Sequence, residues 1–216
     1  IDSRDIETGL AWTKIALAAG ADWIEAGSPL IVFEGVRAIG ALAQQAGTTP
    51  VVADFKAQDG VAKYFVEAGR QGAKIATVLG IVADGSVKAA VLGGREAGVK
   101  VMADMFSIPK DGLAARAEQL QRMGVDYLLL HLGHDEARDE PHRHVLDGLE
   151  ELVGAVAIPV GVATFAEQEA VEAVRRGASF VVQGHPLLEP ENAEELLGEF
   201  IQAVKSAGLN PSAPGE

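Results

Sequence analysis

Short apolar runs alternate with longer amphipathic stretches along the whole of this chain, and this alternation limits the possible folds most strongly. The run at 127–130 (Tyr-Leu-Leu-Leu) is apolar on both faces, which is typical of buried parallel strands. Several amphipathic stretches run into a glycine, at Gly69, Gly124 and Gly177, a common way for a helix to end. Eight strand–helix units follow one another without a linker. The pattern predicts a single α/β domain, a (β/α)8 TIM barrel, with a doubly wound open sheet as the alternative.

The eight units have approximate boundaries in the sequence. We expect the barrel domain over 1–209 and a disordered tail over 210–216, where Pro, Gly and Ser are frequent. The segment 135–144 reads as a polar loop after the sixth strand. The strands are expected to end near Asp2, Glu25, Asp54, Leu79, Asp104, His131, Thr164 and Gly184. The helices are expected near 5–19, 34–46, 60–68, 85–97, 111–123, 144–153, 166–176 and 193–206.

Composition excludes several classes of protein. Lys and Arg number 18 against 31 Asp and Glu, and no basic stripe is present, so we expect no nucleic-acid partner. The absence of cysteine excludes disulfides, thiolate metal sites and cysteine nucleophiles. No apolar run approaches membrane-spanning length, so we expect no membrane partner and a cytoplasmic location. The chain opens at Ile1 without a methionine, which we interpret as a cut inside the first strand, and a removed targeting peptide is compatible with it.

Charged residues gather where the strands should end. In the segment 51–60 (Val-Val-Ala-Asp-Phe-Lys-Ala-Gln-Asp-Gly), Asp54 and Lys56 should project to the same side, because residues i and i+2 of a strand share a face. Buried charges are costly unless they are paired or used, so the pair is either a structural ion pair or chemical machinery. Chemistry in this fold lies at the carboxyl ends of the strands. The candidates there are Asp2, Glu25, Asp54, Lys56, Asp104 and His131.

The residue types indicate a divalent metal and an anionic intermediate. Glu25 and Asp54 offer hard oxygen ligands, which suit Mg²⁺ better than zinc, although Glu25 could instead bind loop amides. Lys56 should stay protonated beside carboxylates, and a fixed ammonium can stabilise an oxyanion such as an enediolate. A Schiff-base role would require a lowered pKa, which the neighbouring carboxylates disfavour.

The histidines differ in their expected roles. His131 ends the sixth strand and could transfer protons near neutral pH. His134 could contact substrate or be an ordinary loop residue. His142 and His144 read as a solvated loop. Asp104 could be catalytic or could order its neighbours, and the sequence leaves both roles open.

Two motifs carry a resemblance to a known family. They are the DxKxxD motif of Asp54, Lys56 and Asp59 and the upstream Glu-x-Gly-Ser-Pro motif that begins at Glu25. With these motifs the chain resembles the orotidine 5'-monophosphate decarboxylase suprafamily over nearly its whole length, and within it the 3-hexulose-6-phosphate synthase group. Further matching segments are 34–38, 76–80 and 131–133.

The resemblance implies a Mg²⁺-dependent lyase. Its reaction would be an aldol condensation of formaldehyde with the sugar phosphate ribulose 5-phosphate, or the reverse, through a metal-stabilised enediolate. It implies a homodimer with shared active sites. It also implies metal ligands at Glu25 and Asp54 and catalytic roles for Lys56, Asp2, His131 and Asp59, the last acting in the neighbouring subunit's site.

Alternatives within and beyond catalysis stay open. A 3-keto-L-gulonate-6-phosphate decarboxylase would use the same apparatus, but that group usually has an arginine three residues after the sixth-strand histidine, where this chain has His134. A non-catalytic sugar-phosphate sensor is the other alternative.

The phosphate-binding end departs from the family pattern. The family has Gly-Gly after strand seven and Gly-Arg after strand eight, whereas this chain has Val162-Ala163 and Gly184-His185. The lost glycines hinder close approach of the backbone, and histidine is a weaker, pH-dependent partner for an anion than arginine. The site could still bind phosphate, or it could fit an unphosphorylated sugar. Candidate substrate-binding residues are Thr164, Gly184, His185 and His134.

Overall fold

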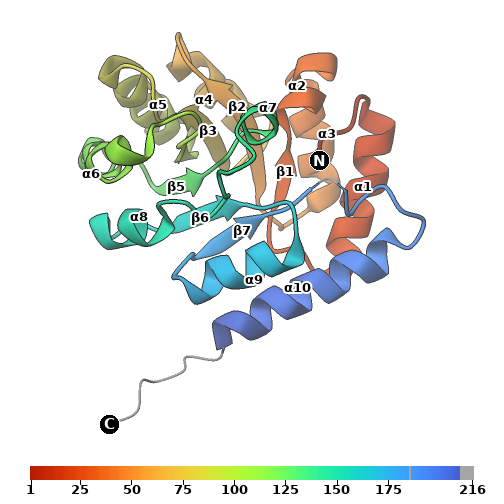
Figure 1. The fold of residues 1–216 in the computed structure, drawn as a ribbon. Coiled ribbons are helices and arrows are strands. Elements are labelled where there is room, and N and C mark those ends of the chain that lie inside the picture. The colour runs from red at the N-terminus through yellow and green to blue at the C-terminus, as the bar shows by residue number, and fades with distance from the viewer. Residues whose placement is uncertain (185, 210–216) are drawn as a thin grey trace.

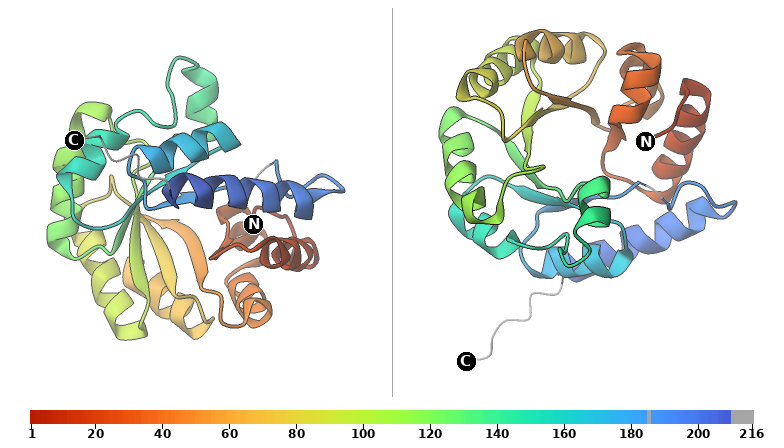
Figure 2. Two further views of the ribbon diagram at one scale, coloured as in Figure 1. Left: turned by 90° about the horizontal axis from the view of Figure 1, so that it is seen from below. Right: turned by 45° about the horizontal axis from the view of Figure 1, so that its top comes forward.

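Seven parallel strands form one curled sheet whose order follows the chain, and the helices cover its outer face (Figure 1; Figure 2). The computed structural model describes residues 1–184 and 186–209. The α/β class and the barrel-type architecture are confirmed, and the doubly wound alternative is wrong because the strand order has no reversal. The strands are β1 (Ile24–Ala26), β2 (Val51–Ala57), β3 (Ile75–Leu79), β4 (Lys100–Asp104), β5 (Tyr127–Leu130), β6 (Val160–Ala163) and β7 (Phe180–Val182).

The helices follow the expected alternation closely. The named helical elements are α1 (Ile6–Ala19), α2 (Ser28–Glu34), α3 (Arg37–Ala46), α4 (Val61–Arg70), α5 (Asp84–Ala97), the 3-10 turn η1 (Lys110–Gly112), α6 (Leu113–Met123), α7 (His134–Asp139), α8 (Leu149–Ala155), α9 (Glu167–Arg175) and α10 (Ala193–Leu209). The helix expected near 34–46 is α3, which begins at Arg37. A further short helix, α2, was not expected; it precedes α3 and ends at Gly35, which has a positive φ of 73°. The polar loop expected over 135–144 contains α7, whose first turn carries Asp135 and Glu136, where the helix dipole favours negative charge.

The expected first strand, ending near Asp2, is not formed as a strand. Ile1 alone continues the sheet beside β1: its amino group donates to the Glu25 carbonyl at 2.8 Å, and its carbonyl accepts from Gly27 N at 3.0 Å. The chain then turns into α1, whose first turn is capped by Asp5 accepting from Thr8 N at 2.8 Å. One residue of pairing is too short for a strand, so β1 and β7 are the edges of the sheet in the part of the chain described.

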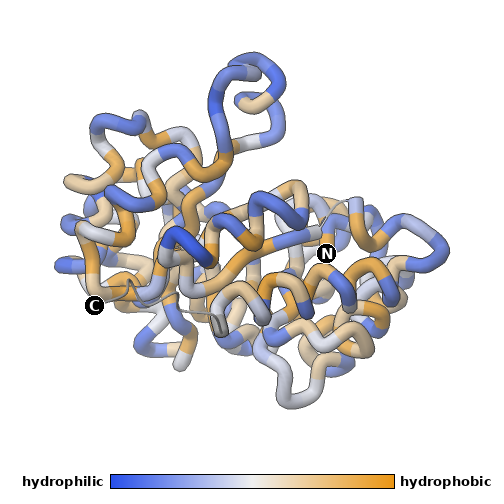
Figure 3. Tube along the Cα trace, turned by 60° about the horizontal axis from the view of Figure 1, so that its bottom comes forward, coloured by the Kyte–Doolittle hydropathy of each residue, from blue (hydrophilic) through white to orange (hydrophobic). Residues whose placement is uncertain are grey.

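Large aromatic side chains fill the amino-terminal end of the curled sheet. Trp23 lies 5.5 Å from Tyr127 and 5.2 Å from Phe180 between ring centroids, with tilted or edge-on geometry. Gly161 makes this possible, since a Cβ there would lie 2.1 Å from the Phe180 ring. These rings pack against inward-facing Val52, Ile75, Met102 and Leu129. Hydrophobic and hydrophilic segments alternate along the chain trace (Figure 3).

None of the helices within 1–184 and 186–209 is long and apolar enough to cross a membrane. The expected tail over 210–216 lies outside the described residues, and the domain boundary at 209 stays a prediction.

Candidate active site

An irregularity in β2 sets the geometry of the site. Ala53 pairs with Ala76 and Ala57 pairs with Val78, so residues 54–56 bulge opposite the single residue Thr77. Within the bulge Lys56 has a φ of 45°, in the left-handed region that side-chain-bearing residues rarely occupy. Asp54 and Lys56 therefore meet as expected, but through a bulge and not through the regular alternation of a strand.

Lys56 lies among oxygen atoms. Its ammonium forms an ion pair with Asp54, donates to Ser28 Oγ at 3.2 Å and lies 3.9 Å from Asp104 Oδ2. Burial by itself would lower the pKa of Lys56, but the negative charges of Asp54 and Asp104 outweigh it and raise that pKa. The lysine is thus held as a cation, which favours electrostatic stabilisation over Schiff-base chemistry.

Both oxygens of the Asp54 carboxylate have partners. Oδ1 accepts from Thr77 Oγ1 at 2.9 Å, and Oδ2 accepts from Ser28 Oγ at 2.8 Å and from Lys56. Burial by itself would raise the pKa of Asp54, but Lys56, Ser28 and Thr77 together hold it below its usual range. Asp54 is consequently ionised at neutral pH although it is only 4% exposed.

Glu25 lies on the neighbouring strand β1 in a different electrostatic state. Burial, and next the charge of Asp54, raise its pKa to about 8. Among the described residues no loop amide donates a hydrogen bond to its carboxylate, so the loop-amide alternative finds no support. A bound cation would relieve the repulsion between these two carboxylates.

Mg²⁺ suits this arrangement because it keeps several waters and needs only one or two carboxylates from the protein. In the described ranges no three His, Asp or Glu side chains converge as a metal site, so this chain's contribution would be Glu25 and Asp54 alone.

The buried Asp104 and the partly buried His131 form a pair beside Lys56. His131 Nδ1 lies 2.9 Å from Asp104 Oδ2, and Asp104 Oδ1 accepts from Phe106 N at 3.0 Å. An ionised carboxylate can only accept, so the hydrogen of the pair belongs on Nδ1, and Nε2 is left for a ligand. Burial by itself would lower the pKa of His131, but the hydrogen bond and charge of Asp104 raise it. The structure thus connects Asp104 directly to His131, the link that the sequence left open.

In the described part of the chain, two expected carboxylates, Asp2 and Asp59, make no hydrogen bond or ion pair with Asp54, Lys56 or His131, although the charge of Asp2 contributes to the raised pKa of Glu25. Asp2 lies against Gly27, where a Cβ would come within 1.8 Å of its Oδ1. Asp2 and Glu25 line a cavity of about 590 Å³ beside the open edges of β1 and β7. Asp59 is exposed between β2 and α4.

The candidate phosphate-binding residues lie at the ends of β5, β6 and β7. Thr164 is buried and donates to Gln183 Oε1 at 3.0 Å, and Gly184 forms an isolated bridge with Pro186. His134 begins α7, is exposed, and lies 3.1 Å from an Arg138 nitrogen through Nε2. His185 lies outside the described residues.

The amides at the start of α9 already have a partner. Glu169 accepts from Phe165 N at 2.9 Å and from Ala166 N at 3.1 Å through the same carboxylate oxygen. A helix amino terminus commonly binds phosphate through such amides. Here an internal carboxylate occupies the two amides that directly precede the first helical residue, Glu167, which adds to the loss of the two glycines in weakening this end as a phosphate site.

Comparison with known proteins settles the family. The profile of the orotidine 5'-phosphate decarboxylase / HUMPS family matches residues 1–206. The chain belongs to this family. A 3-hexulose-6-phosphate synthase from Staphylococcus epidermidis RP62A is 35% identical over 114 residues, and one from Bacillus subtilis strain 168 is 34% identical over 114 residues. Each match covers 53% of this chain and 53% of the relative, so the similarity spans about half the length of these relatives.

Two solved structures match over nearly the whole chain. The 3-hexulose-6-phosphate synthase of Salmonella typhimurium has a TM-score of 0.87 at 24% identity and covers 96% of this chain and 97% of its own. The 3-keto-L-gulonate-6-phosphate decarboxylase of Vibrio cholerae has a TM-score of 0.78 at 17% identity and covers 95% of each chain. At these identities the structural likeness establishes the fold.

Sequence reasoning assigned no role to Ser28 and Thr77, which both hold Asp54. Ser28 lies in the Glu-x-Gly-Ser-Pro motif and Thr77 in the segment 76–80, both of which carry the family resemblance. A hydroxyl group within the apolar strand β3 is the available signal, because buried polar groups need partners.

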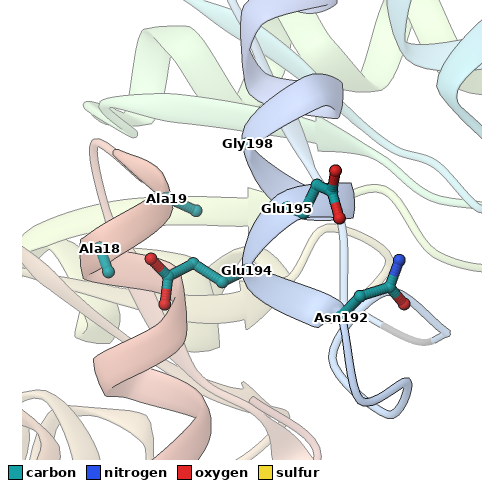
Figure 4. Close-up of a pocket in the computed structure, with 6 residues that line it drawn as sticks. All are labelled: Ala18, Ala19, Asn192, Glu194, Glu195 and Gly198. Carbon is teal, nitrogen blue, oxygen red and sulfur yellow. The ribbon is translucent and has the colours of Figure 1, made fainter.

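A groove on the outer surface of this HUMPS-family chain lies between α1 and α10, with a volume of about 480 Å³. Figure 4 shows Glu194 directed toward α1, with Glu195 on the same helix. The groove contains none of the strand-end residues described above, and we assign it no chemistry.

Proposed function

We propose that this chain is a lyase of the 3-hexulose-6-phosphate synthase type. It would join formaldehyde to ribulose 5-phosphate, or catalyse the reverse cleavage. The observation that carries the proposal is the partly buried Lys56 ammonium, held beside Asp54 and Asp104 with His131 attached to the same network. This arrangement suits a reaction whose intermediate carries negative charge on oxygen.

The proposed step uses an enediolate. A proton leaves the hydroxymethyl carbon next to the ketone, the resulting enediolate attacks the formaldehyde carbon to form the new carbon–carbon bond, and the aldehyde oxygen takes up a proton. His131 Nε2 would remove and return these protons, since Nδ1 is held by Asp104. Lys56 would balance the charge on the enediolate oxygen, and Asp2 would help to position the substrate.

Glu25 and Asp54 would hold Mg²⁺, which when bound adds positive charge next to the developing oxyanion. The paired carboxylates support this assignment. A ligand that binds only the native state raises the melting temperature. Mg²⁺ should therefore stabilise the parent, and Asp54→Asn should remove that effect.

A second candidate is an enzyme that forms the same intermediate from another substrate, such as a 3-keto-L-gulonate-6-phosphate decarboxylase-like enzyme acting on a sugar acid. The bonding of the Phe165 and Ala166 amides to Glu169, just before α9, favours a substrate that does not place a phosphate there. A non-catalytic sensor would not require Lys56 for turnover, and Mg²⁺ would not stabilise it.

We further propose a homodimer with shared sites, completed by Asp59 of the partner. Exposed apolar residues follow β1 to β3 on the same side of the sheet as Asp59: Val32 is 77% exposed, Phe33 63% and Ile81 51%. Mixing Lys56→Ala with Asp59→Asn subunits tests the sharing. Random exchange should restore about a quarter of parental activity, because half of the dimers would then hold one intact site. No recovery after verified exchange would contradict shared sites.

The deciding experiment measures formaldehyde consumption that depends on ribulose 5-phosphate, with Mg²⁺ present and Lys56→Ala as the control. Turnover in the parent that is lost in the variant supports the synthase assignment. If Mg²⁺ stabilises the parent but no turnover is found, the second candidate becomes the better explanation. Unphosphorylated ketoses and keto acids would then be the next substrates to test.

A further inference from the structure

We propose that Thr77 is a positioning residue that fixes the spatial relation of Asp54 and Lys56. Its hydroxyl donates to Asp54 Oδ1 at 2.9 Å and accepts from the Lys56 backbone N at 2.9 Å. A hydroxyl can do both at once, because it has one donor and two acceptor positions. The catalytic consequence rests on the proposed function, whereas the structural role does not.

The bulge explains why such a residue is needed. Between the pairs Ala53–Ala76 and Ala57–Val78, β2 has three residues opposite a single residue of β3. The Lys56 amide is consequently diverted from the regular ladder of the sheet, and Thr77 Oγ1 takes the place of a carbonyl as its acceptor.

The hydrogen bond from the Lys56 amide to Thr77 also stabilises the strained backbone conformation of Lys56. Lys56 has a φ of 45°, and a residue with a side chain persists in this region only where surrounding contacts hold it. Thr77 is 0% exposed, so water cannot readily substitute for its hydroxyl. Ser28 holds the other oxygen and the carbonyl of Asp54 and contacts the Lys56 side chain. Within the described ranges, Thr77 is the residue whose side chain bonds both to the Asp54 carboxylate and to the Lys56 backbone.

Three variants separate the hydroxyl from the shape of the side chain. Thr77→Val keeps the branched shape and removes the hydroxyl, and Thr77→Ser keeps the hydroxyl. Thr13→Val is the matched control, since Thr13 is also 0% exposed and donates to the Gly9 carbonyl within α1. Thr77→Ala replaces Thr77→Val if the valine variant does not fold, because it leaves space for water.

The first readout is hydrogen exchange of the Lys56 amide by NMR, which does not depend on activity. Loss of its acceptor should speed exchange by roughly tenfold or more in Thr77→Val, while Thr77→Ser restores protection and Thr13→Val leaves it at the parental level. The second readout is steady-state kinetics: kcat should fall by about tenfold in Thr77→Val with a smaller change in KM, because displaced catalytic groups mainly affect the reacting state.

The outcomes distinguish the two proposals. Parental exchange at Lys56 in Thr77→Val, or the same loss in Thr77→Ser, would overturn the positioning role. Faster exchange in Thr77→Val alone supports that role even if no aldol activity is found in any variant, a result that would instead count against the proposed function. Unchanged kcat despite faster exchange would overturn the catalytic consequence.

Discussion

Replacing Asp104 by asparagine should uncouple His131 from the site while preserving its shape. The Asp104 carboxylate is 0% exposed, lies 2.9 Å from His131 Nδ1 and accepts from Phe106 N at 3.0 Å. Asparagine retains one oxygen for the Phe106 amide but loses the negative charge that favours the imidazolium. Burial, which opposes the charged ring, remains.

The size of the effect follows from the bond that is lost. A hydrogen bond to a charged group contributes about 1.5 to 3 kcal/mol, and one pKa unit corresponds to about 1.4 kcal/mol. The pKa of His131 should therefore fall in Asp104→Asn, because the bond and the negative charge that raise it are both removed while the burial that lowers it remains. The ring carbon protons report this titration by NMR, and the His131→Gln spectrum assigns the signal among the five histidines.

The sign also fixes a dependence of stability on pH. A histidine whose pKa is raised in the folded state stabilises the fold below its ordinary pKa of 6.5, and this contribution disappears as the pH rises through the raised value. The stability gap between parent and Asp104→Asn in urea should thus be larger at about pH 5 than at about pH 9. Asp126→Asn is the control, because it neutralises a half-buried carboxylate that is bonded to Lys100 and to the Val101 amide and is not paired with a histidine. An unshifted His131 titration in Asp104→Asn would refute the coupling.

Two further perturbations test the raised pKa of Glu25 and the packing of the aromatic rings at the amino-terminal end of the sheet. The Glu25 pKa rises from 4.5 to about 8 on folding, so the metal-free parent should lose on the order of a few kcal/mol of stability as the pH rises through that interval. In Glu25→Gln, the free energy of unfolding measured in urea should depend less on pH. An equal pH dependence in both proteins would contradict the shift. Gly161→Ala should destabilise the fold by about 1 to 3 kcal/mol, because the new Cβ would lie 2.1 Å from the Phe180 ring. Gly154→Ala is the control and should be neutral or stabilising, because Gly154 lies on helix α8 with open space around it. Similar denaturation midpoints for the two variants would show that the Phe180 ring moves aside freely.

The fold was predictable because its signal is repeated in every unit. Runs such as Tyr127–Leu130 and the glycines that end helices give the same answer along the chain, so an error in one element does not change the architecture. The first unit fails where that redundancy is absent: Ile1 contributes one residue of pairing before the chain turns at the Asp5 cap. Likewise, the charges in the first turn of α7 suggest a polar loop, although they also suit a helix amino terminus.

The site was predictable in its residues but not in its construction. Alternation along a regular strand placed Asp54 and Lys56 on one side, yet the structure joins them through a bulge that no periodicity announces. A bulge depends on how two strands pair, so the sequence of β2 alone does not reveal it. Thr77, which accepts the hydrogen bond from the Lys56 amide in the bulge, lies on the neighbouring strand β3. The same limit applies to Asp104 and His131, which are 27 residues apart and meet because consecutive parallel strands end at one edge. Single-strand patterns can identify the charged residues, whereas the hydroxyl groups and carboxylates that orient them emerge only when neighbouring strands are read together.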